Sequence, residues 1–227
     1  MRTFSLFSTL FLAGALALPG AVSVDQLLAN MDKAAAAWKG MRAETSWTQY
    51  TKLVDDSSVE SGTVVVRRVA DGRVDFKVQF TEPYPRDLLV RGTQVEIYKP
   101  RIATVEEYDV SKSKDKLEQA LLSGFGVSGK FLREHYEIAM QGEEAVEGVN
   151  AVKVELVPKD QGMRESIAKV VIWVSPETWQ PVQQRLYQPN GDHRTYLYTK
   201  VEINPGLKDA DFKLDIPKKV KRQKKDL

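Results

Sequence analysis

One segment of the sequence comes close to a phosphate-binding loop. In LLSGFGVSGKFLREHY (121–136), Gly124 is followed after four residues by Gly129-Lys130, which is nearly the G-x-x-x-x-G-K-[ST] signature. Phe131 stands where that motif needs a Ser or Thr hydroxyl for Mg²⁺, and a helix-like run leads in where a strand is required. The segment therefore does not predict a nucleotide site, and Lys130 is expected to face solvent.

Residues that could catalyse a reaction are few and form no recognised motif. The chain has no cysteine and two histidines, His135 and His193, neither of which lies in a G-x-S-x-G or H-E-x-x-H pattern. We expect His135 on an exposed helical face and His193 beside a turn. The acidic pairs Glu106-Glu107 and Glu143-Glu144 are expected to be solvated at strand ends or in loops. We therefore expect no enzyme, no cofactor and no metal site.

The charge of the chain is unevenly distributed. The last ten residues, KKVKRQKKDL, hold six cations and one aspartate, a net charge of +5, so the remaining chain carries −3 of the total of +2. A nucleic-acid-binding domain would spread its Lys and Arg over a folded face, so we expect no nucleic-acid partner. We interpret this basic tail (218–227) as a solvated, disordered end. The alternative is a weak electrostatic contact with an anionic membrane or an acidic protein.

The first 21 residues have the pattern of a secretory signal peptide. Arg2 precedes an apolar run from about Phe4 to Leu18, and Ala15-Leu16-Ala17 fits a cleavage site, with a cut after Ala21 as a second option. The alternative is a buried N-terminal helix. Because the chain has no cysteine, we expect neither disulfides nor a lipid anchor, and release as a soluble protein.

The rest of the chain reads as one helix followed by many strands. Ser23 and Gln26 have capping-box spacing, and apolar residues then recur at helical spacing, which predicts a helix over 24–39. Beyond it, segments such as RVDFKVQF and AVKVELV alternate apolar and polar residues with a period of two, separated by turn sequences. We count nine or ten strands joined mostly by short hairpins, which predicts an antiparallel sheet with one apolar face.

The region 111–136 interrupts this alternation. Leu117, Ala120 and Leu121 indicate one short helix and Phe131-Leu132 a second, with Gly124, Gly126 and Gly129 between them as possible hinges. No linker divides the chain, so we expect one domain over 22–217. A large sheet exposes more apolar surface than these helices can seal, and either a packed core or a hydrophobic cavity would satisfy that surface.

Several segments, taken in chain order, are those of a known family. They are Trp38–Ala43, Trp47 and Gln49, Gly62–Arg68, Glu82-Pro83, Leu89–Gly92, Ile97–Pro100, Tyr187–Asp192, Tyr196, Val201–Asn204 and Asp211–Pro217. This pattern resembles the LolA-type lipoprotein carriers of the bacterial periplasm and the wider LolA/LolB-like group of lipoprotein-sorting proteins. The sequence departs from it at Val69, where the family has Pro, and at Arg91, where the family has Asp.

The resemblance implies a mainly β (α+β) fold. It is an incomplete antiparallel β-barrel, or half-barrel, with an N-terminal helix and a helical lid over a hydrophobic cavity. Arg68 matches the family's arginine, which ties the lid to the barrel by hydrogen bonds to backbone; the alternative for Arg68 is an exposed charge at a strand end. The expected cavity wall is Val74, Phe76, Val78, Phe80, Leu89, Val95 and Ile97, and the expected lid is Leu121, Leu122, Phe125, Phe131 and Leu132. Plain core packing is the alternative for each wall residue.

The function implied by the resemblance is a soluble periplasmic carrier. It would hold the acyl chains of lipoproteins or lipids and escort them towards the outer membrane. An inner-membrane lipoprotein-releasing transporter and an outer-membrane receptor are expected partners, and the carrier is expected to be a monomer. The alternatives are a sensing module for lipids or lipoproteins on the same fold, or an envelope enzyme.

Overall fold

The computed structural model describes residues 22–69, 73–113 and 125–226. The expected signal peptide, the first short helix of the interruption, and the lid residues Leu121 and Leu122 lie outside the described residues. In the described part, no helix is both long and apolar enough to cross a membrane.

The N-terminal helix forms as its sequence predicts and ends two residues early. Helix α1 spans Val24–Ala37. The backbone amide of Gln26 donates to the Ser23 hydroxyl at 3.2 Å, and the amide of Ser23 donates to the Gln26 side chain at 3.0 Å, which completes the capping box. At the other end Trp38 is already extended, and the Asn204 side chain donates to the Ala37 carbonyl at 3.0 Å. The exit of the helix is therefore fixed by a residue far along the chain.

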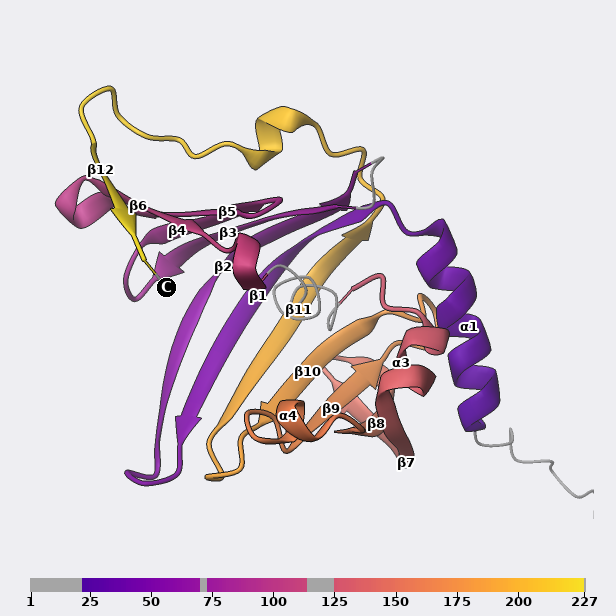
Figure 1. Cartoon of the computed structure of the whole chain (residues 1–227). Coiled ribbons are helices and arrows are strands. Elements are labelled where there is room, and N and C mark those ends of the chain that lie inside the picture. The colour runs from indigo at the N-terminus through magenta and orange to yellow at the C-terminus, as the bar shows by residue number, and fades with distance from the viewer. Residues whose placement is uncertain (1–21, 70–72, 114–124, 227) are drawn as a thin grey trace, which may run out of the picture.

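Twelve strands of the described chain form one sheet (Figure 1). They are β1 (Gly40–Thr51), β2 (Asp56–Arg68), β3 (Val74–Glu82), β4 (Arg86–Arg91), β5 (Gln94–Lys99), β6 (Thr104–Asp109), β7 (Tyr136–Val146), β8 (Val149–Pro158), β9 (Lys169–Val174), β10 (Pro181–Tyr187), β11 (His193–Ile203) and β12 (Lys221–Lys225). The short helices are η1 (Pro100–Ile102), η2 (Ser111–Ser113), α3 (Gly129–His135), α4 (Gln161–Arg164) and η3 (Asp209–Phe212).

The sheet consists of two antiparallel meanders. The strand order is β12-β6-β5-β4-β3-β2-β1-β11-β10-β9-β8-β7, so β1–β6 form one meander and β7–β11 the other, and β1 pairs with β11 to join them. The order has two ends and does not close, which confirms the predicted open half-barrel. Since β6 and β7 lie at opposite sides of the sheet, the chain between Asp109 and Tyr136 has to pass from one side to the other.

The inner face of the sheet carries the main apolar clusters. Helices α1 and α3 pack over β7–β10, where Leu27, Met31, Leu132, Val154 and Ile172 belong to one buried cluster. Figure 1 shows both helices on this side of the sheet. A second cluster lies over β1–β3 and includes Trp38, Val64, Val78, Phe80 and Phe125. The predicted apolar face is therefore present. Helices α1 and α3 cover its half over β7–β10, whereas Trp38 and Phe125 pack on its half over β1–β3.

The outer face of the first meander is covered by the C-terminal segment. Figure 1 shows this segment (yellow) crossing β2–β5 after β11. The Phe212 side chain is fully buried, with the Arg67 guanidinium 4.5 Å from the centre of its ring. The buried Lys77 ammonium donates to the Lys213 carbonyl at 2.7 Å. The segment is thus part of the core and closes the outer face.

The basic tail is an ordered strand, which corrects the prediction of a disordered end. Strand β12 pairs with β6 in parallel, from Lys221 beside Thr104 to Lys225 beside Tyr108. The Arg222 guanidinium forms ion pairs with Glu96, at 2.7 Å, and with Glu107. These pairs, and the backbone pairing, give a lysine-rich sequence of low β-propensity a place in the sheet. β12 is also the reason that the sheet is not wholly antiparallel.

We expect Phe212→Ala to lower the free energy of unfolding by about 3–5 kcal/mol, because it leaves a cavity under the C-terminal segment. Chemical denaturation measures this directly. Val59→Ala is the matched control, since Val59 is 48% exposed and its truncation should change stability by less than about 0.5 kcal/mol. Equal, small effects from the two substitutions would contradict a structural role for the C-terminal segment.

Candidate functional site

The predicted wall residues converge on the inner face of β3–β5, with one exception. Residues paired directly across neighbouring strands point to the same side of a sheet. Val78 pairs with Leu88, and Leu88 pairs with Ile97; Phe76 pairs with Val90, and Val90 pairs with Val95. Val74, Phe76, Val78, Phe80, Val95 and Ile97 therefore share one face. Leu88 and Val90 belong to the same face and were missed.

Leu89 lies on the opposite face, which corrects its assignment to the wall. It pairs with Lys77 on β3 and with Glu96 on β5, and both of these point outward. Its side chain is only 4% exposed, because the outer face is itself covered by the C-terminal segment. The run Leu88-Leu89-Val90 is apolar throughout, so alternation could not indicate which residue faces inward.

The wall is only partly covered. Val74, Val78 and Phe80 are buried, whereas Phe76, Leu88, Val95 and Ile97 are partly exposed. Towards the second meander, aromatic residues continue the same surface. The Trp47 ring meets the Phe80 ring edge to face at 4.8 Å and the Tyr196 ring at 5.0 Å. Helices α1 and α3 pack over β7–β10 instead, so this half of the inner face is the candidate site for an apolar ligand.

A small polar group lies within this apolar surface. The Gln184 side-chain amide donates to the Tyr198 hydroxyl at 3.1 Å, while the Gln184 amide oxygen is buried and has no partner among the residues that the structure describes. Burial raises the pKa of the Tyr198 hydroxyl, and it also raises that of Tyr196. Both phenols are therefore uncharged at neutral pH, and the site offers hydrogen bonds without charge. Sequence reasoning had no signal for this group, since Gln184 is one of many polar residues in predicted strands.

The described lid residues divide between the two clusters. Phe125 is 3% exposed, and its ring meets the Tyr198 ring edge to face at 4.7 Å, so it lies over the middle of the sheet. Leu132 is buried in the cluster under α1, and Phe131 packs against that cluster with its ring stacked on His135 at 4.2 Å. The predicted second short helix, α3, is present. Of the described lid residues, Phe125 is the one that covers the candidate site.

Gly126 and Gly129 allow close packing, and their role as hinges stays a prediction. Gly126 has a φ of +72°, and a Cβ there would lie 2.5 Å from the Trp38 ring. At Gly129 a Cβ would lie 2.1 Å from the Leu28 carbonyl oxygen on α1. The lid segment therefore approaches α1 more closely than any other residue would permit. Lys130 is exposed, as expected.

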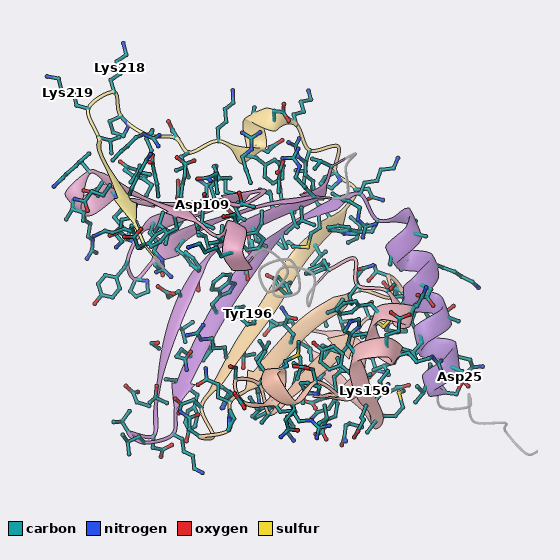
Figure 2. All side chains as sticks on the ribbon, viewed as in Figure 1. Asp25, Asp109, Lys159, Tyr196, Lys218 and Lys219 are labelled. Carbon is teal, nitrogen blue, oxygen red and sulfur yellow. The ribbon has the colours of Figure 1, made fainter. Side chains whose placement is uncertain are left out.

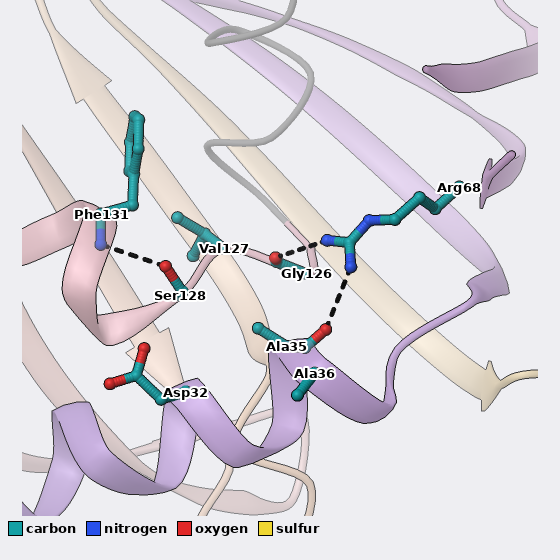
Figure 3. Close-up of a pocket in the computed structure, with 8 residues that line it drawn as sticks. All are labelled: Asp32, Ala35, Ala36, Arg68, Gly126, Val127, Ser128 and Phe131. Carbon is teal, nitrogen blue, oxygen red and sulfur yellow. Dashed lines mark hydrogen bonds between the residues drawn. The ribbon is translucent and has the colours of Figure 1, made fainter. Parts of the chain in front are cut away.

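Arg68 connects the lid segment to helix α1 (Figure 3). Its guanidinium donates to the Ala35 carbonyl and to the Gly126 carbonyl, each at 3.2 Å, and lies 5.3 Å from the centre of the Trp38 ring. These are the backbone contacts that the family resemblance implies. The Gly126 amide also donates to the Gln180 side chain at 2.9 Å. A pocket of about 380 Å³ opens beside Arg68, between α1 and the segment 126–131.

The histidines and the acidic pairs lie in separate elements. Glu143-Glu144 is exposed towards the end of β7, as expected, whereas Glu106-Glu107 lies in the middle of β6 in ion pairs with Lys99 and Arg222, so its expected solvated strand-end position is wrong. His135 is half-buried, with its Nδ1 3.0 Å from the Phe131 carbonyl oxygen, so the expected exposed face is wrong. His193 begins β11 and stacks on Tyr50 at 4.7 Å. Across residues 22–69, 73–113 and 125–226, no group of three or more His, Cys, Asp or Glu side chains could hold a metal ion.

The comparisons with known proteins show the family and the fold. A family profile described as "-like: Uncharacterized protein" matches residues 80–207, more than half of the chain, so the chain belongs to that family. Comparison with curated proteins gives no match. Among solved structures, MucB in the Pseudomonas aeruginosa MucA/MucB complex matches with a TM-score of 0.51 and 14% identity, over 84% of this chain and 60% of that one.

Two further solved structures match this chain, the second with a TM-score too low to support the fold. LprF from Mycobacterium bovis matches with a TM-score of 0.50 and 12% identity, over 87% of this chain and all of the other. The LolA superfamily protein NE2245 from Nitrosomonas europaea gives a TM-score of 0.40 at 14% identity, over 86% of this chain and 99% of that one. The fold is LolA-like, as the sequence resemblance predicts. At these identities the likeness describes the fold alone.

We expect Arg68→Ala to loosen the lid segment locally. Removing two charged hydrogen bonds to backbone should make the Gly126 amide exchange its hydrogen about tenfold to a hundredfold faster. Hydrogen exchange read by mass spectrometry measures this. Arg67→Ala is the control, because Arg67 points to the outer face, where it donates to Asp75 at 2.7 Å and to Asp209 at 2.6 Å. An equal response of the Gly126 amide to both substitutions would argue against a role of Arg68 in holding the lid segment to α1.

We expect Gly126→Ala to destabilise the protein more than Gly148→Ala. Both glycines have positive φ, +72° and +82°, so each substitution costs about 1 kcal/mol in backbone strain. Only Gly126 has a neighbour that a Cβ would strike, which adds about 1–3 kcal/mol of overpacking against Trp38. Thermal or chemical unfolding compares the two. If both variants lost the same stability, the close packing of Gly126 against the Trp38 ring would be contradicted.

Proposed function

We propose that this protein binds the acyl chains of lipoproteins or lipids on the inner face of β3–β5 and carries them through the periplasm towards the outer membrane. One observation carries the proposal. The inner face of one half of the sheet is sealed by helices, while the other half is a partly exposed apolar wall beneath Phe125. The LolA-like fold supports a carrier-type domain for lipoproteins.

The energetics favour a cavity of this kind. Each buried methylene contributes roughly 0.8 kcal/mol, so a chain of about 16 carbons gains roughly 10 kcal/mol on leaving water. Phe76, Leu88, Val95 and Ile97 offer apolar contact of the kind that such a chain needs. The uncharged Tyr198 hydroxyl, which accepts from Gln184, can donate a hydrogen bond to an ester group of the ligand without the cost of burying a charge.

Release of the ligand requires a cover that can move, and the segment starting at Phe125 supplies it in this proposal. In the state described here Phe125 lies on Tyr198, and Arg68 holds the next residue, Gly126, against α1. Opening would break the hydrogen bonds that Gly126 forms with Arg68 and with Gln180, and it would expose the apolar surface that Phe125 now covers. A ligand that fills this surface offsets that cost, so binding and opening are coupled.

A protein-binding module is the second candidate. MucB, which shares the fold, is seen in complex with MucA, and this chain spans 60% of the MucB chain. Such a module would sense lipids or lipoproteins through a protein partner. The carrier proposal also includes export to the periplasm and contact with an inner-membrane transporter and an outer-membrane receptor.

Native mass spectrometry of the gently purified protein tests the proposal. We expect co-purifying acylated species on the wild-type chain and their loss from Ile97→Asp, because a carboxylate on the wall would have to be desolvated by the ligand. Ile97 is partly exposed, so this variant should still fold.

Val59→Asp is the matched control, since it places the same charge at a side chain that is 48% exposed and points to the outer face. It should retain the ligand. A wild-type protein that is uniformly free of ligand, and that does not extract a lipoprotein from membranes, would exclude the carrier. Retention of acylated species by Ile97→Asp would show that the ligand does not bind on this wall.

A further inference from the structure

Exposed apolar side chains, and lysines that form no ion pair with another described residue, lie around the turns at one end of the first meander. Tyr84, between β3 and β4, is 62% exposed, and Ile102, in η1, is 63% exposed. The Arg101 guanidinium lies 5.0 Å from the centre of the Tyr84 ring and donates to the Pro83 carbonyl at 3.3 Å, which holds the two turns together. We call the surface formed by Tyr84, Ile102, Lys218, Lys219 and Lys221 the β12 tip.

The start of the C-terminal strand brings Lys221 to this same place. The backbone amide of Lys221 donates to the Ala103 carbonyl at 2.9 Å, directly after Ile102. Lys218 and Lys219 precede it, and Figure 2 shows both side chains projecting away from the sheet. All three lysines are exposed, and in the described part of the chain none of them forms an ion pair. Arg222, in contrast, is engaged by Glu96 and Glu107, so it anchors the strand.

We propose that the β12 tip docks the protein on the surface of an anionic phospholipid bilayer. Lysines near such a surface are attracted to its headgroups, and a tyrosine with an isoleucine beside it can enter the interface. The tip is made of separate protruding side chains. Lysine is depleted from protein–protein interfaces, whose cores are closely packed, so an acidic protein fits these observations less well.

The position of the tip relates it to the candidate ligand site. Strand β5 carries Val95 and Ile97 on the wall and leads, through Lys99, directly into η1. Docking through Ile102 would therefore place one end of the apolar wall close to the membrane. This inference does not require that the wall holds a ligand, and it can be tested separately.

Flotation of the full-length mature chain with lipid vesicles tests the proposal. We expect binding to vesicles with equal shares of phosphatidylcholine and phosphatidylglycerol, no binding to phosphatidylcholine alone, and loss of binding as salt is raised. Replacing Lys218, Lys219 and Lys221 by Gln should lower the affinity about a hundredfold, since each lysine contributes about fivefold. The control replaces the exposed Lys33, Lys39 and Lys130 by Gln, which changes the net charge equally.

The apolar part has its own pair of variants. Tyr84→Ser with Ile102→Ser should weaken vesicle binding by about tenfold or more. Leu53→Ser with Val54→Ser is the control, because these side chains are 93% and 66% exposed on the turn between β1 and β2. All these positions are exposed, so unfolding curves should match the wild type, and ligand retention in native mass spectra should not change.

Several outcomes would overturn the docking proposal. They are equal binding to neutral and anionic vesicles, equal losses from the lysine variant and its control, or no binding to phosphatidylglycerol vesicles at all. If the wild type ignored the vesicles but bound immobilised polyglutamate through Lys218, Lys219 and Lys221, the tip would belong to an acidic protein partner. A wild-type protein that floats with anionic vesicles but carries no acylated species, and extracts no lipoprotein from membranes, would contradict the carrier function alone.

Discussion

The antiparallel pairing of β1 with β11 holds the two meanders in one sheet, and the other parts of the molecule depend on it. It runs from Met41 beside Ile203 to Tyr50 beside His193, with one bulge. Directly beyond it, Asn204 accepts hydrogen bonds from the amides of Lys39 and Gly40 and donates to the last carbonyl of α1. The helix that seals one half of the inner face is therefore positioned by a contact between the two ends of the domain.

The same pairing explains why the inner face has two different halves. With the meanders side by side, the chain has to pass from β6 to β7, and the described end of that passage, Phe125 to Leu132, lies on the inner face. Over β7–β10, α1 and α3 make a closed core. Over β3–β5, partly exposed apolar side chains remain. Arg68 lies at the boundary of the two halves, where it contacts both the helix and the lid segment.

Local patterns in the sequence predicted the elements well, because those patterns depend on near neighbours. The capping box of Ser23 and Gln26 and the alternation of Val74, Phe76, Val78 and Phe80 are both found as expected. Leu89 could not be placed, because three consecutive apolar residues carry no alternation. The contacts of Arg68 followed from a family resemblance, since no local pattern connects an arginine on β2 to a carbonyl on α1.

The remaining differences come from contacts between distant residues. Arg222 finds Glu96 and Glu107 more than a hundred positions away, so a strand forms where the local composition predicts none. Gly126 and Gly129 were visible as glycines, but whether a glycine serves as a hinge or allows close packing depends on the Trp38 ring and the Leu28 carbonyl beside them. The Gln184 amide oxygen, for which the described part of the chain supplies no partner, is likewise a property of the assembled sheet.

The addition of β12 beside β6 also has a consequence for self-association. An outermost strand has unpaired backbone groups that can recruit a strand from another copy, which is a route to aggregation. Here the outermost strand is five residues long and reads Lys-Arg-Gln-Lys-Lys. A second copy pairing at this edge would bring two rows of like charge into contact. The short basic strand thus occupies one edge of the sheet and opposes pairing with the same edge of a second copy.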